Sequence, residues 1–292
     1  EIGKVVRRLV SVGALITWFI ASVSAYYLLK FDIALSILFG AIVIVTGPTV
    51  IIPLMTNVRP VGQTASILKW EGIVIDPIGA TVAVLVFEGI SAGGPQAAAT
   101  VVLAGIVKTI LIGGSFGIIA ALVMYFFLKR YWIPDYLQNP FSLMVVLIAA
   151  TAANWFQQEA GLVSATVMGI VLANQKSITV KHIIAFKENL RVLLISGLFI
   201  FLAARLELSD FRGVGLPVLV FLAILFFVAR PLSVFFSTTG SGLENRERLF
   251  LAWVAPRGIV AASVASIFAL RLSENGYAQG SMLIPYTFLV IV

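Results

Sequence analysis

The chain has 292 residues, of which 60% are hydrophobic and only 11% are charged, and its formal net charge is +7. Soluble domains have about 25% charged residues, so this chain cannot cover a globular surface with polar groups, and a soluble fold is excluded. It has no cysteine and a single histidine, His182, which excludes disulfides, thiolate metal sites and chemistry that needs several histidines.

A helix needs about 20 residues to cross the hydrocarbon core of a bilayer. The first residue is a glutamate and the last residues, YTFLVIV, are apolar, so we expect the chain to be the interior of a longer protein. Ten apolar stretches predict transmembrane helices, and together they predict an all-α, multi-pass membrane protein. They are 9–29, 33–57, 67–88, 97–128, 140–156, 160–174, 189–208, 214–236, 249–271 and 279–292.

The connecting segments alternate in charge along the chain. Cations precede the first stretch and follow the second, fourth, sixth and eighth, whereas the intervening segments have few. Basic loops stay in the cytoplasm, so the first helix is expected to run outward. This pattern also explains the positive net charge without a nucleic-acid partner.

The second stretch contains a predicted interruption. It reads AIVIVTGPTVIIPLM, with Gly47 and Pro48 at its centre. Glycine and proline at membrane depth leave backbone groups unsatisfied, so such breaks belong where protein or a water-filled cavity surrounds them. A simple proline kink is the alternative.

The third stretch, ILKWEGIVIDPIGATVAVLVFE, contains the sharpest candidate, Asp76. Ionisable residues inside membrane spans are functional by default. Gly72 and Ala80 lie one turn away on the same face, and Pro77 frees a backbone carbonyl one turn back. We predict that Asp76 binds an ion, with a structural carboxylate as the alternative.

The fourth stretch contains GGSFG at 113–117, which matches the nucleophile-elbow pattern. That elbow requires a strand, a turn and a nearby base, and none is expected here. Glycines at this spacing favour helix packing instead, and a serine protease is rejected. Further along, Arg205 is either an interfacial anchor or a buried counter-charge, whereas Arg230 is expected to snorkel to the membrane surface.

The ninth stretch has a second interruption, at Pro256, Arg257 and Gly258. The two interrupted helices run in opposite directions in the predicted topology, which is typical of inverted-repeat transporters with a site at the midplane. Buried charges of opposite sign tend to pair. We therefore predict an ion pair between Glu71 and Arg257.

The motifs VIVTGPTV, ILKWEGIVIDPIGA, GLVSATVMGIVLANQ, LLISGLFIFLAARLEL and WVAPRGIVAASVA, in this order, resemble a sodium/proton antiporter of the monovalent cation:proton antiporter superfamily. The resemblance covers nearly the whole chain. It implies a thirteen-helix fold of which the first three helices and part of the last are missing here, two crossing broken helices, and a homodimer. We treat 1–292 as one transmembrane transport domain, with core helices at approximately 9–88 and 214–292 and intervening helices at 97–208.

The resemblance also implies roles for individual residues. Asp76 would bind a cation and a proton alternately, Glu71 would pair with Arg257, and the breaks at Thr46–Pro48 and Pro256–Gly258 would cross near the site. Two positions depart from the family pattern: Gly47 replaces the usual aspartate of T-D-P, and Ile75 replaces an asparagine or aspartate. We therefore expect Thr46 and backbone carbonyls to supply more of the coordination.

The predicted function is exchange of Na⁺ or K⁺ for protons by alternating access, with one-for-one, electroneutral stoichiometry. No enzyme activity, cofactor or nucleic-acid partner is expected, and the expected location is a bacterial plasma membrane, with a cytoplasmic regulatory domain beyond the chain as a further partner. A transport-inactive scaffold or sensor is the alternative. An intramembrane aspartyl protease would need two deep aspartates, and a channel would need a ring of charges or a repeated filter.

Overall fold

The computed structural model describes residues 2–58, 60, 62–91, 95–204, 215–254, 257–274 and 278–291. The described residues form helices and connecting turns without any strand, which confirms the predicted fold class. The chain divides into two compact units, one formed by residues 1–90 and 199–292 and the other by residues 91–198.

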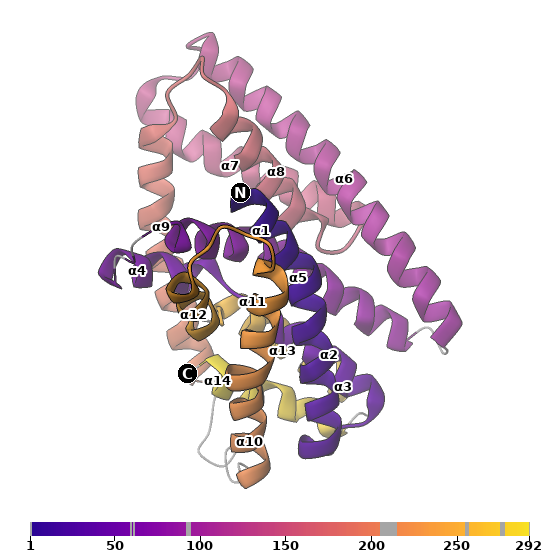
Figure 1. Ribbon diagram of the computed structural model, residues 1–292. Coiled ribbons are helices and arrows are strands. Elements are labelled where there is room, and N and C mark those ends of the chain that lie inside the picture. Colours follow the sequence, from indigo (N-terminus) through magenta and orange to yellow (C-terminus); the bar gives the residue numbers. More distant parts are fainter. Residues whose placement is uncertain are drawn as a thin grey trace. The chain divides into compact units, whose positions relative to one another are not determined.

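The first unit combines both ends of the chain (Figure 1). Its first helix, Ile2–Leu29, is continuous but contains two π-helical segments. A second continuous helix, Leu216–Thr238, contains one π-helical segment, directly before Arg230. In order, the elements are α1 (Ile2–Arg8), π segment Leu9–Gly13, α2 (Ala14–Ser24), π segment Ala25–Leu29, α3 (Ile33–Val43), α4 (Pro48–Val58), α5 (Thr64–Ser91), α10 (Leu216–Ile224), π segment Leu225–Ala229, α11 (Arg230–Thr238), α12 (Asn245–Trp253), α13 (Ile259–Glu274), a 3₁₀ turn (Ala278–Met282) and α14 (Leu283–Ile291).

A tight connection joins the first helix to α3. Lys30 adopts the left-handed conformation, with φ of 57°, and ends the first helix. The side chain of Asp32 then accepts a hydrogen bond from the backbone N–H of Leu35 at 2.6 Å, which caps α3. Helices α2 and α3 approach closely at Gly40, where a Cβ atom would overlap the Ser22 hydroxyl. The short connection and the small residue therefore produce a closely packed helical hairpin.

Aromatic side chains form much of the buried core of the first unit. Phe39 of α3 packs against Phe31 and against Phe221 of α10, with ring centroids 5.7 Å and 5.5 Å apart. At the Ser91 end of α5, the ring of Phe87 stacks on Phe268 of α13 at 4.9 Å. These contacts bring α3, α10, α5 and α13 into one core, because aromatic pairs bury large areas in preferred geometries.

Helix α5 is the most buried of the long apolar helices. In the most apolar 18-residue window of α5, 61% of the residues are buried. In the corresponding windows of the other four candidate membrane spans, between 28% and 39% of the residues are buried. A helix that is surrounded by protein can contain charged groups that a lipid-facing helix cannot. The position of α5 is therefore compatible with the charges of Glu71 and Asp76.

The second unit is a helical bundle built on small residues. It contains most of α9 (Lys181–Ala204), together with α6 (Pro95–Lys129), α7 (Asp135–Phe156) and α8 (Ala160–Asn174). A Cβ atom at Gly113 or Gly117 of α6 would lie 2.6 Å or 2.5 Å from a backbone carbonyl of α8, whereas a Cβ atom at Gly114 would meet nothing within 4 Å. The packing role predicted for these glycines is confirmed for Gly113 and Gly117 and is wrong for Gly114.

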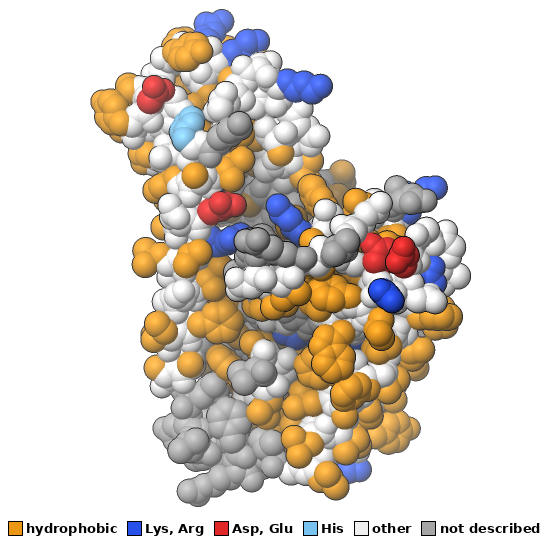
Figure 2. Space-filling model, turned by 60° about the vertical axis from the view of Figure 1, so that its left-hand side comes forward, with side chains coloured by type: hydrophobic (Ala, Val, Ile, Leu, Met, Phe, Trp, Pro, Cys, Tyr) orange, Lys and Arg blue, Asp and Glu red, His pale blue; other side chains and the backbone are white. Residues whose placement is uncertain are grey.

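The described helices are suited to a bilayer. Five are long and apolar enough to cross a membrane, and four shorter apolar helices accompany them. Large hydrophobic side chains such as Phe19, Leu193 and Phe227 are 68% to 70% exposed, and hydrophobic groups are spread over the described surface in Figure 2. Lipid chains cover such side chains without the cost that water would impose. The chain is an integral, multi-pass membrane protein.

Candidate functional site

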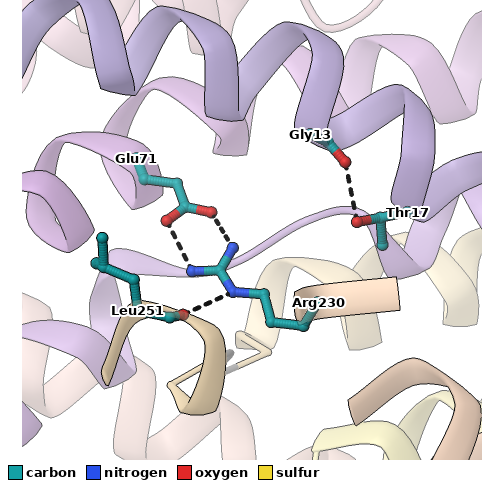
Figure 3. Close-up of polar contacts among 5 residues, drawn as sticks. All are labelled: Gly13, Thr17, Glu71, Arg230 and Leu251. Atoms are coloured by element: carbon teal, nitrogen blue, oxygen red, sulfur yellow. Dashed lines mark hydrogen bonds and ion pairs between the residues drawn. The ribbon is translucent and has the colours of Figure 1, made fainter. Parts of the chain in front are cut away.

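A buried ion pair joins Glu71 of α5 to Arg230 of α11 (Figure 3). The two guanidinium nitrogens Nη1 and Nη2 donate to Oε1 and Oε2 at 2.5 Å and 3.0 Å, and the two side chains are 6% and 5% exposed. The Nε–H of Arg230 donates to the backbone carbonyl of Leu251 in α12 at 3.1 Å. One arginine therefore holds α5, α11 and α12 together, in the bidentate geometry that guanidinium groups favour.

This geometry corrects two predictions. Glu71 was predicted to pair with Arg257, but among the described residues its ion-pair partner is Arg230. Arg230 was predicted to reach the membrane surface, but it is buried. The physical reason lies in the helix around Arg230. Pro231 has no N–H for an α-helical hydrogen bond, and its ring crowds the carbonyl one turn earlier. The turn before Arg230 is widened into the π segment Leu225–Ala229.

Close packing against the first helix holds Arg230 in place. A Cβ atom at Gly13 would lie 2.5 Å from the hydroxyl of Ser233, which is three residues after Arg230. The carbonyl of Gly13 accepts a hydrogen bond from the Thr17 hydroxyl at 3.0 Å (Figure 3). The glycine therefore allows α11 to approach the first helix at the level of the ion pair.

We expect Gly13→Leu to lower the stability of the folded protein by about 1–3 kcal/mol, because a larger side chain would force α11 away from the first helix. Gly3→Leu is the matched control, since a Cβ atom at Gly3 meets nothing within 4 Å. The measurement is thermal unfolding of both variants in detergent. Equal midpoints for the two variants would contradict the assigned packing.

Arg257 lies at the second interruption and is buried, with 6% exposure. It is close enough to Arg230 and Glu71 to interact electrostatically with both. The described buried cluster thus contains two arginines and one glutamate.

Asp76 is the candidate ion-binding carboxylate. It lies five residues after Glu71 on the same helix, about 7.5 Å further along the axis at 1.5 Å per residue. Its Oδ1 atom is buried and has no hydrogen-bond partner in the described part of the chain, and the same is true of the Thr46 hydroxyl. A carboxylate oxygen that is buried without a donor has a desolvation cost, which a bound proton or cation would remove.

Helix α5 approaches the first interruption one turn after Asp76. A Cβ atom at Gly79 would lie 2.5 Å from a methyl group of Val45, the residue that precedes Thr46. Gly79 thus allows α5 to approach the non-helical segment that contains Thr46. Ile75 is 3% exposed, so an apolar side chain lies beside Asp76 where relatives of the resembled family have an amide or a carboxylate.

The helix is not broken at Pro77. Helix α5 continues from Thr64 to Ser91 with Pro77 inside it, and the Pro77 carbonyl accepts a hydrogen bond from the Thr81 hydroxyl at 2.7 Å. The prediction that Pro77 belongs to broken-helix backbone is wrong, because the flanking turns remain helical. Gly72 and Ala80, on the Asp76 face, are buried as expected for small packing residues.

The two predicted interruptions are confirmed by the helix boundaries. Helix α3 ends at Val43 and α4 begins at Pro48, while α12 ends at Trp253 and α13 begins at Ile259. Gly47 and Gly258 are buried in these non-helical segments. Pro256 and Arg205 lie outside the described residues, so their predicted roles stay predictions.

Sequence reasoning missed Arg230 and Gly79 as parts of the site. A signal for Arg230 was present in the Arg-Pro pair within an apolar stretch, since a proline inside a helix marks local distortion. Gly79 lies three residues after Asp76, a spacing that places both on neighbouring positions of one helix face. This spacing could have added Gly79 to the face of small residues that was predicted from Gly72 and Ala80.

Comparisons with known proteins place these features in a family. A family model described as the transmembrane sodium/hydrogen exchanger matches residues 1–292. The chain is 28% identical to Na⁺/H⁺ antiporter 1 of Methanocaldococcus jannaschii over 248 residues, which cover 82% of this chain and 57% of that protein. It is 24% identical to the probable Na⁺/H⁺ antiporter 2 of the same organism, over 93% of this chain and 67% of that protein. The chain therefore spans little more than half of the first relative and two thirds of the second.

Solved structures support the same fold. The sodium proton antiporter MjNhaP1 from Methanocaldococcus jannaschii at pH 8 has a TM-score of 0.80 and 24% identity, covering 99% of this chain and 74% of that one. An electron microscopy map of MjNhaP1 gives a TM-score of 0.76. These relatives are transporters and not enzymes. Both the fold and the match over residues 1–292 agree with the predicted resemblance, and the chain belongs to the sodium/hydrogen exchanger family.

Proposed function

We propose that the chain is the transport unit of a secondary active antiporter that exchanges Na⁺ or K⁺ for protons at Asp76. The observation that supports the proposal most directly is the buried Oδ1 atom of Asp76, which has no hydrogen-bond partner among the described residues. A carboxylate oxygen that is buried without a donor is costly, and either a proton or a cation removes that cost. The Thr46 hydroxyl, also buried and without a described partner, would be a second oxygen ligand.

Competition between proton and cation follows from elementary electrostatics. Burial disfavours the charged form of a carboxylate, and a nearby cation favours it. A protonated Asp76 therefore cannot hold the cation, and a cation-bound Asp76 cannot hold the proton. Alternating access then carries one or the other in each direction, with the two broken helices supplying backbone oxygens from Thr46–Pro48 and from the segment around Gly258.

The charges of the buried cluster favour one-for-one exchange. Arg230, Arg257 and Glu71 are all buried within the first unit, and their charges do not change in the proposed cycle. Asp76 with a bound proton and Asp76 with a bound monovalent cation have the same net charge. Both loaded forms therefore cross with equal charge, so the exchange is expected to be electroneutral and insensitive to the membrane potential.

One observation favours a second function, a transport-inactive scaffold or sensor. Gly47 and Ile75 provide no side-chain oxygens at two positions where the resembled family has them, and Ile75 is buried in the core. A site with fewer oxygens would bind a cation more weakly. Under this alternative, the fold and the ion pair are retained while exchange is lost.

The location and assembly also belong to the proposal. We place the protein in a bacterial plasma membrane, with the basic segments in the cytoplasm, and we propose a homodimer. Arg205 remains a proposed counter-charge, and a cytoplasmic regulatory domain remains a proposed partner.

The test is proton movement in vesicles that contain the purified full-length protein. We expect an imposed gradient of Na⁺ or K⁺ to drive proton flux at a rate that does not change when the membrane potential is clamped at different values. Li⁺ is measured in parallel to define selectivity. A potential-dependent rate would contradict one-for-one exchange, and absence of flux with all three cations would favour the scaffold.

A further inference from the structure

The carboxylate of Glu247 lies between the N-termini of two helices. Its Oε1 atom accepts a hydrogen bond from the backbone N–H of Gln63 at 3.1 Å, directly before α5 begins at Thr64. Its Oε2 atom accepts from the backbone N–H of Glu244 at 3.0 Å, directly before α12 begins at Asn245. Helix N-termini have free N–H groups and a partial positive charge. One carboxylate thus stabilises the first turns of both helices.

The backbone around Gly62 is built for this contact. Gly62 has a φ of 82°, a conformation that other residues rarely adopt, and a Cβ atom there would overlap the Oε1 atom of Glu247. Only glycine therefore brings the N–H of Gln63 to the carboxylate. The contact also lines an open hollow of about 580 Å³, whose wall includes Arg246 and Phe250. Because the hollow is open, the N–H of Gln63 is exposed to exchange with water whenever the hydrogen bond opens.

The same two helices are tied together a second time, deeper in the first unit. Arg230 binds Glu71 of α5 and the Leu251 carbonyl of α12. Leu251 is one turn after Glu247, and Glu71 is about two turns after Thr64. Two ties at different heights fix both the separation and the angle of a pair of helices. Helix α5 contains Asp76, and α12 ends at Trp253, directly before the second interruption.

We propose that Glu247 is a positioning residue for cation binding, which fixes α5 relative to α12 and so holds Asp76 in register with the second interruption. The inference rests on the proposed function. A cation needs several oxygens at fixed positions at once, whereas a proton needs a single oxygen. Loosening the two helices therefore weakens cation binding more than proton binding.

The chain offers matched variants for a test. Glu247→Ala removes both hydrogen bonds of the carboxylate. Glu244→Ala is the control, because the Glu244 side chain belongs to the capping box of α12 alone and leaves the contact with Gln63 in place. Gly62→Ala displaces the Glu247 carboxylate from the other side. When Glu247→Ala is already present, the Cβ atom that Gly62→Ala introduces has no carboxylate to overlap. In that background, Gly62→Ala is expected to add only the strain of its backbone conformation to the effect of Glu247→Ala.

Two measurements follow, both on the purified full-length protein and neither dependent on transport. Hydrogen exchange at the Gln63 amide is expected to be faster in Glu247→Ala and Gly62→Ala, and unchanged in Glu244→Ala. The apparent affinity for Na⁺ and for K⁺, measured from the cation-dependent rise in melting temperature, is expected to fall about tenfold in the same two variants, the order of one hydrogen bond to a charged group.

Vesicle assays separate positioning from a general loss of structure. If Glu247 positions the site, the KM for the cation rises in Glu247→Ala while the maximal rate per folded protein changes little. A purely structural role would lower the maximal rate and leave the KM unchanged. Unchanged Gln63 exchange, or unchanged cation affinity in Glu247→Ala, would overturn the inference.

The outcomes also distinguish this inference from the proposed function. A wild-type protein that is stabilised by the cation but moves no protons would contradict the proposed exchange and leave the positioning role standing. A wild-type protein that the cation does not stabilise at all would overturn the positioning role.

Discussion

Replacement of Asp76 by asparagine is expected to reduce cation-driven proton flux to the level of protein-free vesicles. Asparagine has nearly the same size as aspartate but has no charge and cannot exchange a proton at neutral pH. The fold should remain intact, because Asp76 makes no described hydrogen bond through Oδ1. The measurement is flux in vesicles, with the amount and melting temperature of the reconstituted protein determined in parallel.

Glu88→Gln is the matched control for this experiment, since Glu88 is a half-buried carboxylate on the same helix, α5. We expect it to retain flux. Full activity of Asp76→Asn would move the exchange site to another group and would refute the proposed mechanism. Thr46→Val extends the test, because valine has a similar shape without the hydroxyl. It is expected to raise the KM for the cation and to leave proton binding unaffected.

Replacement of Glu71 by glutamine is expected to destabilise the folded protein by about 3–5 kcal/mol. The change leaves Arg230 buried without its carboxylate, and an uncompensated buried charge has a cost of this order. A second replacement, Arg230→Met, should recover most of the loss, because a long apolar side chain can replace a buried ion-pair member. Thermal unfolding in detergent measures both effects.

Arg257→Met in the Glu71→Gln background is the control that separates the two possible partners. It should recover less stability than Arg230→Met, because Arg257 makes no ion pair with Glu71 among the described residues. Greater recovery with Arg257→Met would show that the pair predicted from the sequence, Glu71 with Arg257, is the one that matters for stability.

The sequence was sufficient to predict features that depend on local composition. Apolar stretches of about 20 residues predict membrane helices because lipid excludes unpaired backbone groups. The interruptions at 44–47 and between Trp253 and Ile259 were predictable for the same reason, since the Gly-Pro and Pro-Arg-Gly sequences there disfavour a regular helix. Asp76 stood out because a carboxylate in such a helix has few explanations other than function.

The partner of Glu71 was not predictable in this way. Several arginines lie within the predicted apolar stretches, among them Arg230 and Arg257, and sequence position alone cannot show which of them faces Glu71. The choice depends on how α11 is rotated about its axis and on how closely Gly13 lets it approach the first helix. Both are properties of packing between segments far apart in the chain. Glu247 was equally hidden, because its partner Gln63 is 184 positions away.

The π segment Leu225–Ala229 has a consequence for how this site could arise and be lost. A π-helical turn accommodates an additional residue within an α-helix, and one residue corresponds to about 100° of rotation in a helix of 3.6 residues per turn. A one-residue insertion or deletion in this turn therefore rotates everything that follows, and Arg230 is the first residue that follows. A single codon lost here would turn the guanidinium away from Glu71 while every other side chain of the site kept its identity. In related sequences, the number of residues in this turn is therefore expected to correlate with the buried pair. Sequences that keep this length can keep the pair of Glu71 and Arg230, and sequences that lose a residue must neutralise Glu71 in another way.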